Sequence, residues 1–122
     1  MVFGTFDGLH EGHRAFLREA RGHGDYLIAV IPEDRIVERL KGHLPKINLA
    51  ERFANLKEED KVDEIVTSGE LPGTWGVVRK YKPDVIAVGY DQYALKEDLE
   101  SHLGDLGYTP EIKVMHNYEK NA

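Results

Sequence analysis

The chain has 122 residues and a formal net charge of −6, with 41% hydrophobic and 31% charged residues. A chain of this length supports one hydrophobic core, so we treat residues 1–122 as a single domain. The acidic balance argues against a general nucleic-acid-binding protein, and no apolar run approaches the ~20 residues of a membrane span. The absence of cysteine and of a signal-peptide pattern leads us to expect a cytoplasmic protein.

The first twelve positions after Met1, VFGTFDGLHEGH, predict a short buried strand, a glycine-rich turn and the start of a helix. His10 and His13 are three positions apart and share a helix face. The first turn of a helix carries unpaired N–H groups and a positive dipole, which favour an anion. Thr5 adds a hydroxyl group, and the backbone can approach a ligand closely at three glycines, Gly4, Gly8 and Gly12. The stretch therefore predicts a phosphate site.

A histidine pair of this spacing has two other interpretations, a metal site and two surface side chains. A zinc site requires three or four ligands, and the chain contains neither cysteine nor the H-E-x-x-H spacing. We therefore expect no metal ligand among the side chains of this turn.

The rest of the chain alternates between helical and strand patterns. A first unit of strand, helix and strand within about thirty residues predicts a right-handed βαβ crossover. Continuous apolar runs such as YLIAVI and VIAV are typical of parallel strands covered on both faces. We expect an α/β fold, a Rossmann-like open parallel sheet of about five strands with helices on both faces. The expected helices cover 11–21, 33–40, 48–57, 73–81 and 96–106, and the expected strands after the first cover 26–31, 62–66, 85–88 and 111–115.

The two ends of the chain are short. Only three residues precede Gly4, whereas a strand usually has about five or six residues. Residues 116–122 are polar and show no final helix pattern. These ends are consistent with a domain that is clipped on both sides.

The segment GTFDGLHEGH is similar to the signature of the cytidylyltransferase-like nucleotidyltransferases, in which an HxGH motif holds the triphosphate of a nucleotide. The resemblance implies that His10 and His13 bind and stabilise the triphosphate. It also implies that a cradle of largely backbone contacts is completed by Gly4, Thr5, Phe6, Glu11 and Gly12.

Two basic positions further along the chain gain a role from the same resemblance. The loop KGHLPK is similar to a KGR-P-like segment whose lysine reaches the phosphates, which implies this role for Lys41, with His43 in place of the expected arginine. Arg52 precedes the strand VDEIV by ten positions, where the family has a phosphate-contacting arginine. The alternatives are a solvated basic face for Lys41 and a surface arginine beside Glu51 for Arg52.

The segment KPDVIAVGYDQ resembles the archaeal-type FAD synthases within the family. The resemblance implies that Gly89 and Asp91 bind the nucleotide; alternatively, Asp91 only caps the next helix. Tyr118 occupies the place of a tyrosine near the adenine. The Ser/Thr-rich phosphate-contacting segment that follows in the family is missing from this chain.

The resemblance implies an enzyme that transfers AMP from ATP to FMN with release of pyrophosphate. A substrate phosphate is already anionic at neutral pH, so the site needs positioning and charge stabilisation, not a general base. We expect His10, His13 and Lys41 to supply these, with Mg²⁺ carried by the nucleotide. The alternatives are a cytidylyltransferase using CTP and glycerol 3-phosphate, and a nucleotide-binding module without turnover. The resembled enzymes are commonly homodimers.

Overall fold

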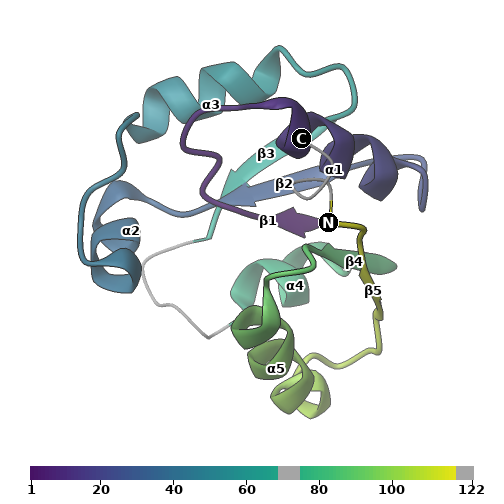
Figure 1. Ribbon diagram of the computed structural model, residues 1–122. Coiled ribbons are helices and arrows are strands. Elements are labelled where there is room, and N and C mark those ends of the chain that lie inside the picture. Colours follow the sequence, from purple (N-terminus) through teal and green to yellow (C-terminus); the bar gives the residue numbers. More distant parts are fainter. Residues whose placement is uncertain (69–74, 118–122) are drawn as a thin grey trace.

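The structure, a computed structural model, describes residues 1–68 and 75–117 and contains a single five-stranded sheet (Figure 1). The spatial order of the strands is β3-β2-β1-β4-β5, and every pairing is parallel. The strands are β1 (Val2–Phe3), β2 (Ile28–Ile31), β3 (Glu64–Thr67), β4 (Val85–Val88) and β5 (Glu111–Val114). The predicted open parallel sheet is confirmed.

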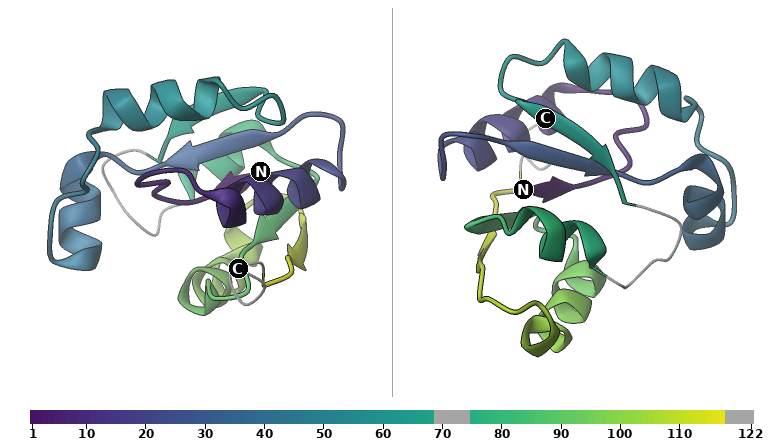
Figure 2. Two further views of the ribbon diagram at one scale, coloured as in Figure 1. Left: turned by 45° about the horizontal axis from the view of Figure 1, so that its top comes forward. Right: turned by 180° about the vertical axis from the view of Figure 1, so that it is seen from behind.

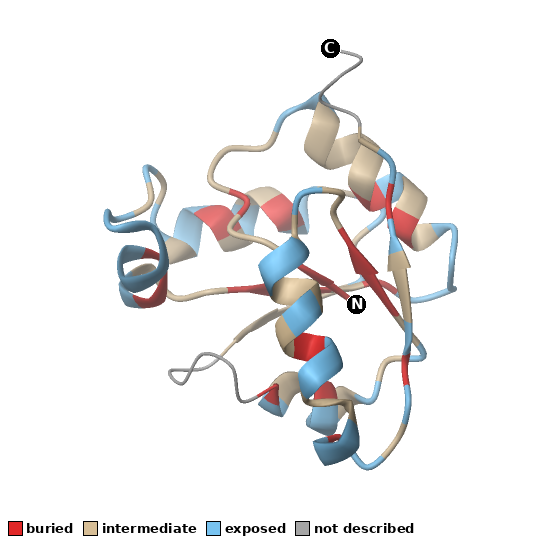
Figure 3. Ribbon diagram, turned by 60° about the horizontal axis from the view of Figure 1, so that its bottom comes forward, coloured by how far each residue is buried: buried red, intermediate tan, exposed pale blue. Residues whose placement is uncertain are grey.

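Alternate strand residues point to opposite sides of the sheet, and here they are apolar on both sides. Helices therefore cover both faces of the sheet. On one face, Val2, Ala29 and Ala87 pack with Leu17 of helix α1 (Glu11–Arg21) and Leu56 of helix α3 (Leu49–Lys57). On the other face, a second hydrophobic cluster contains Val78 of helix α4 (Gly76–Tyr81) and Leu99 of helix α5 (Tyr93–Ser101). Its strand members include Phe3, Val30, Ile86 and Val88. Figure 2 shows these two helix layers from further directions, and Figure 3 shows buried residues gathered along the central strands.

The helices agree with the sequence pattern to within a few residues. They are α1 (Glu11–Arg21), α2 (Asp34–Lys41), α3 (Leu49–Lys57), α4 (Gly76–Tyr81) and α5 (Tyr93–Ser101), followed by a 3₁₀ turn (Leu103–Asp105). The helix expected over 96–106 therefore starts earlier, at Tyr93, and changes to the 3₁₀ turn. The first residues of the helix expected over 73–81 lie outside the described residues.

Strand boundaries differ most where a residue leaves the sheet for a side-chain contact. The strand expected from Tyr26 begins at Ile28, because the Tyr26 side chain is 56% exposed and its hydroxyl donates to Glu64 Oε1 at 2.9 Å. The backbone N–H of Leu27 donates to Asp63 Oδ2 at 2.7 Å instead of to a neighbouring strand.

The strand order reverses direction between β1 and β4. From β1 the chain moves outward through β2 to β3, then crosses back to β4 and continues to β5 on the opposite side. In open parallel sheets, ligands bind at such a switch point, outside the carboxyl ends of the strands. The segments that follow β1 and β4 carry the GTFDGLHEGH and GYDQ sequences.

Candidate active site

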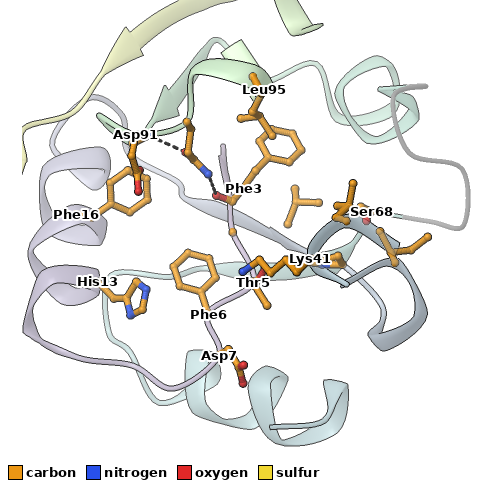
Figure 4. Close-up of a pocket in the computed structure, with 18 of the residues that line it drawn as sticks. Phe3, Thr5, Phe6, Asp7, His13, Phe16, Lys41, Ser68, Asp91 and Leu95 are labelled. Carbon is orange, nitrogen blue, oxygen red and sulfur yellow. Dashed lines mark hydrogen bonds between the residues drawn. The ribbon is translucent and has the colours of Figure 1, made fainter. Parts of the chain in front are cut away.

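A cavity of about 830 Å³ opens at the carboxyl ends of β1, β2 and β4. Its volume lies within the range of small-molecule sites. Most of the residues predicted for the site line it (Figure 4). These are Gly4, Thr5, Phe6, His10, Gly12, His13, Lys41, Gly89 and Asp91.

His10 is the N-cap of α1. Its Nδ1 accepts hydrogen bonds from the backbone N–H of Gly12 at 3.0 Å and of His13 at 3.4 Å. A side chain that accepts from these positions satisfies donors that the helix itself leaves unpaired. The predicted backbone cradle is thus altered at Gly12, because the Gly12 N–H group already donates to His10 Nδ1. An anion at this position would meet the imidazole ring of His10 and not the Gly12 N–H group.

His13 completes a reciprocal arrangement with His10. The backbone N–H of His10 donates to His13 Nδ1 at 3.4 Å, and the two rings stack with centroids 3.9 Å apart. A neutral imidazole that accepts at Nδ1 carries its proton on Nε2. The two rings therefore carry their protons on Nε2, and an N–H group of this kind can donate to the oxygens of a phosphate.

Phe6 shapes the turn that precedes α1. It adopts the left-handed conformation, with φ of 50°, and its side chain is buried. Its ring lies so close to Gly4 that a Cβ atom there would be 2.8 Å from Phe6 Cε2. The ring also meets the His13 ring edge-on, with centroids 5.4 Å apart. Non-glycine residues in this region of φ are strained and concentrate at functional sites.

Asp7 holds a neighbouring loop against the turn, a role that the sequence analysis missed. Its carboxylate accepts the backbone N–H groups of Lys46 and Ile47, both at 2.8 Å. Donation from Lys46 is the main cause that lowers the pKa of Asp7 below its ordinary value, and the N–H of Ile47 and the charge of Arg52 act in the same direction. Asp7 therefore joins the segment after β1 to the segment before α3.

Arg52 does not reach the cavity, so the structure does not bear out its expected phosphate contact. Its side chain is 0% exposed, and its guanidinium donates to Thr5 O at 3.2 Å, Pro32 O at 2.8 Å and Ile47 O at 3.1 Å. It also forms an ion pair with Asp34 at 2.7 Å. A guanidinium with this many donors suits a buried junction, and Arg52 acts on the site by holding three loops together.

Lys41 ends α2, and Figure 4 shows its side chain extending toward Thr5 in the cavity. Glu11 is not among the lining residues; its side chain is 82% exposed and pairs with Arg14 at 3.3 Å. Tyr118 lies outside the described residues. Asp91 lines the cavity after the end of β4, and it does not take its alternative role as the cap of α5, since Gln92 is the N-cap residue of that helix.

Trp75 and Gln92 also line the cavity, although the sequence analysis gave neither a role at the site. Trp75 meets Phe3 edge-on with ring centroids 5.3 Å apart, and its indole N–H donates to Asp98 Oδ2 at 2.8 Å. Gln92 belongs to the GYDQ segment, and the resemblance of this segment to the archaeal-type FAD synthases was the only sequence pattern that pointed to the position of Gln92.

Among the described residues, no three His, Asp or Glu side chains converge as a metal site, and no helix is long and apolar enough to cross a membrane.

These features define a parallel α/β protein with a histidine-capped helix N-terminus at its switch point, an arrangement that many nucleotide-binding proteins share. The sequence comparison is more specific, since the model of the Cytidylyltransferase-like family matches residues 1–120. The chain belongs to the cytidylyltransferase-like family of nucleotidyltransferases.

Relatives in archaea cover most of the chain. A protein named FAD synthase from Pyrococcus horikoshii is 38% identical over 123 aligned positions, which are 99% of this chain and 82% of the relative. A second FAD synthase, from Thermococcus sibiricus, is 40% identical over 101 positions, or 80% of this chain and 68% of the relative.

Two solved structures share the fold. A protein from Thermoplasma volcanium described as a lipopolysaccharide core biosynthesis protein has a TM-score of 0.86 and 34% identity, covering 97% of this chain and 95% of its own. A protein of unknown function from Archaeoglobus fulgidus has a TM-score of 0.78 at 20% identity, covering 99% of this chain and 91% of its own, and supports the fold alone.

Proposed function

We propose that this protein transfers the AMP group of ATP to FMN, which yields FAD and pyrophosphate. Its similarity to relatives named FAD synthase supports this choice of substrates. The observation that carries the proposal is the position of the stacked His10 and His13 rings at the N-terminus of α1, inside the cavity at the switch point.

The reaction requires no general base. A phosphate oxygen of FMN attacks the α-phosphorus of ATP; the new P–O bond forms as the bond to the bridging oxygen of the β-phosphate breaks. Pyrophosphate leaves with the bonding electron pair. The protein has to align the two phosphates and to stabilise the negative charge that builds up on the pyrophosphate.

The described side chains suit these two tasks. His10 and His13 line the cavity from the α1 side and carry Nε2–H groups, and Lys41 brings a positive charge from α2 (Figure 4). Mg²⁺ would arrive on the triphosphate and neutralise part of its charge.

Pyrophosphate release tests the substrates directly. We expect turnover with ATP plus FMN and little with CTP plus glycerol 3-phosphate; the reverse preference would make the protein a cytidylyltransferase for a phosphorylated alcohol. His13→Ala should lower kcat by about 10² or more, the scale of a lost charge-stabilising donor.

The single tryptophan of the chain gives a separate measure of binding, because Trp75 lines the cavity. FMN absorbs where tryptophan emits, so FMN that enters the cavity should quench the fluorescence of Trp75, whereas glycerol 3-phosphate should not. Quenching without pyrophosphate release would identify a nucleotide-binding module without turnover. Unchanged fluorescence and no release would contradict the proposal.

A homodimer in the cytoplasm completes the proposal, with no nucleic-acid or membrane partner. The net charge of −6 argues against a nucleic-acid partner. Sedimentation equilibrium of the purified chain should give twice the mass of 13.9 kDa.

A further inference from the structure

Gln92 lies at the end of β4 and turns its side chain back toward the sheet. A tight turn, in which Gln92 N donates to Gly89 O at 3.1 Å, reverses the chain after β4. Gln92 is the N-cap residue of α5, yet its side chain makes no capping hydrogen bond. The side-chain amide is used at the strand ends instead.

This amide takes the place of one hydrogen bond between β1 and β4. Ala87 N donates to Met1 O at 3.0 Å, and in a parallel ladder the next bond of this series joins the residues two positions on, Gly89 N and Phe3 O. In the structure, Gly89 N donates to Gln92 Oε1 at 2.6 Å, and Gln92 Nε2 donates to Phe3 O at 2.9 Å (Figure 4). One side-chain amide is thus inserted between the two strands.

The neighbouring pairs of strands do not open in this way. Beyond β1, Gly4 N still donates to Val30 O of β2 at 3.2 Å. Beyond β4, Met115 N donates to Val88 O at 2.8 Å, so the ladder to β5 also continues. Among the residues that the structure describes, a side chain separates the carboxyl ends of two paired strands only at the switch point.

The insertion requires both halves of a carboxamide. The Gly89 N–H needs an acceptor, and the Phe3 carbonyl needs a donor, which a single amide supplies in the geometry of a peptide group. A side chain at Gly89 would crowd this bridge, because a Cβ atom there would be 3.3 Å from Gln92 Oε1 and 3.2 Å from Asp91 Oδ1.

We propose that Gln92 is a positioning residue whose inserted amide sets the width of the crevice between the ends of β1 and β4. This inference rests on the proposed nucleotidyl transfer. The width matters because the phosphate-binding turn follows β1 while Asp91 and Tyr90 follow β4, and all of them line the cavity. Gln92 therefore controls the distance between the two segments, after β1 and after β4, that would hold a bound nucleotide.

Gln92→Met keeps the length of the side chain and removes both hydrogen bonds. Gly89 N and Phe3 O are then free to pair directly, which narrows the crevice. Because small misplacements of reacting groups are costly, we expect kcat to fall by about 10-fold or more, with the midpoint of thermal unfolding changed little. Tyr93→Ala is the matched control, because the Tyr93 side chain is 71% exposed and absent from the cavity lining.

Gln92→Glu gives a test that depends on pH. The introduced carboxylate still accepts from Gly89 N but repels Phe3 O, whereas its protonated form donates an O–H group to that carbonyl and restores the inserted bridge. The kcat of this variant, divided by the wild-type value at the same pH, should therefore rise as the pH falls from about 8 toward 5. The same ratio for Gln92→Met should stay constant.

An NMR measurement separates this inference from the proposed function. In the Gln92→Glu chain, the amide proton resonance of Gly89 should titrate with the introduced carboxyl group, whether or not the chain turns over FMN. A Gly89 amide that does not titrate, or a Gln92→Met variant with wild-type kcat, would overturn the role of Gln92. Absence of turnover in the wild type with a normal Gly89 titration would count only against the proposed substrates.

Discussion

At the scale of single residues, the site depends on side chains that do not face its ligand. Arg52 is fully buried and joins the loops after β1, after β2 and before α3 through Thr5, Pro32 and Ile47. Asp7 adds two bonds between the first and third of these loops. The turn between β1 and α1 therefore keeps its shape because the charged side chains of Arg52 and Asp7 hydrogen-bond to backbone groups that are distant in the sequence.

Replacing Arg52 should destabilise the fold more than it alters chemistry. Arg52→Met leaves the Thr5 and Pro32 carbonyls without their donors, each worth about 1–3 kcal/mol when buried, and we expect a total loss of about 3 kcal/mol or more. Urea denaturation measures this loss in the free energy of unfolding. Lys57→Met, an exposed cation on the same helix, is the control. Equal stabilities of the two variants would contradict a structural role for Arg52.

The two hydrogen bonds that the Asp7 carboxylate accepts from Lys46 N and Ile47 N predict that the stability of the fold depends on pH. The pKa of Asp7 is lowered in the folded chain, so its contribution is fully present above the ordinary value of 3.8 and is lost as the pH falls through the lowered value. Asp7→Asn should thus unfold at a lower temperature than the wild type at pH 7. The difference should shrink below pH 3.8. Melting curves across this pH range measure the prediction. A constant difference in melting temperature between the wild type and Asp7→Asn would show that the Asp7 carboxylate does not stabilise the fold.

At the scale of elements, the residue that caps α1 also belongs to the proposed anion site. The Nδ1 of His10 accepts hydrogen bonds from the backbone N–H groups of the first turn. The imidazole ring therefore lies at the positive end of the helix dipole, and its Nε2–H group can donate to an anion there. In the proposed function, the His10 side chain therefore performs two tasks, capping of the helix and binding of the anion.

Two substitutions of His10 should separate these tasks. Asparagine is among the best N-cap residues, whereas alanine lacks the acceptor and typically costs about 1 kcal/mol. We expect His10→Asn to keep the wild-type melting temperature and His10→Ala to lower it, while both lose turnover because the Nε2–H donor is gone. Paired calorimetry and pyrophosphate assays measure this. Full activity in His10→Asn would show that capping alone matters.

The sequence predicted the elements well and the contacts between them poorly. Apolar periodicity and caps are local, so the strand over 85–88 and the helix over 11–21 were correct at both ends. The parts that were missed depend on partners far along the chain. Gln92 bonds to Phe3 across 89 positions and Arg52 to Thr5 across 47, and no local pattern marks either pair.

At the scale of the whole molecule, the strand order places the two halves of the site on one edge. The turn after β1 and the turn after β4 are about eighty residues apart in sequence but adjacent at the switch point. A ligand that bridges them binds only the folded chain, since the unfolded chain does not bring them together. Binding must therefore stabilise the entire domain.

This linkage gives a prediction that needs no turnover. ATP at about 100 times its Kd should add about 2.7 kcal/mol to the free energy of unfolding, which for a domain of this size corresponds to a rise in Tm of roughly 8–14 °C. AMP, which lacks the pyrophosphate tail, should give a smaller rise at the same concentration. In His13→Ala the advantage of ATP over AMP should become smaller, because the tail loses one of its donors. An equal rise with ATP and AMP in the wild type would mean that the α1 terminus is not where the pyrophosphate part of the nucleotide binds.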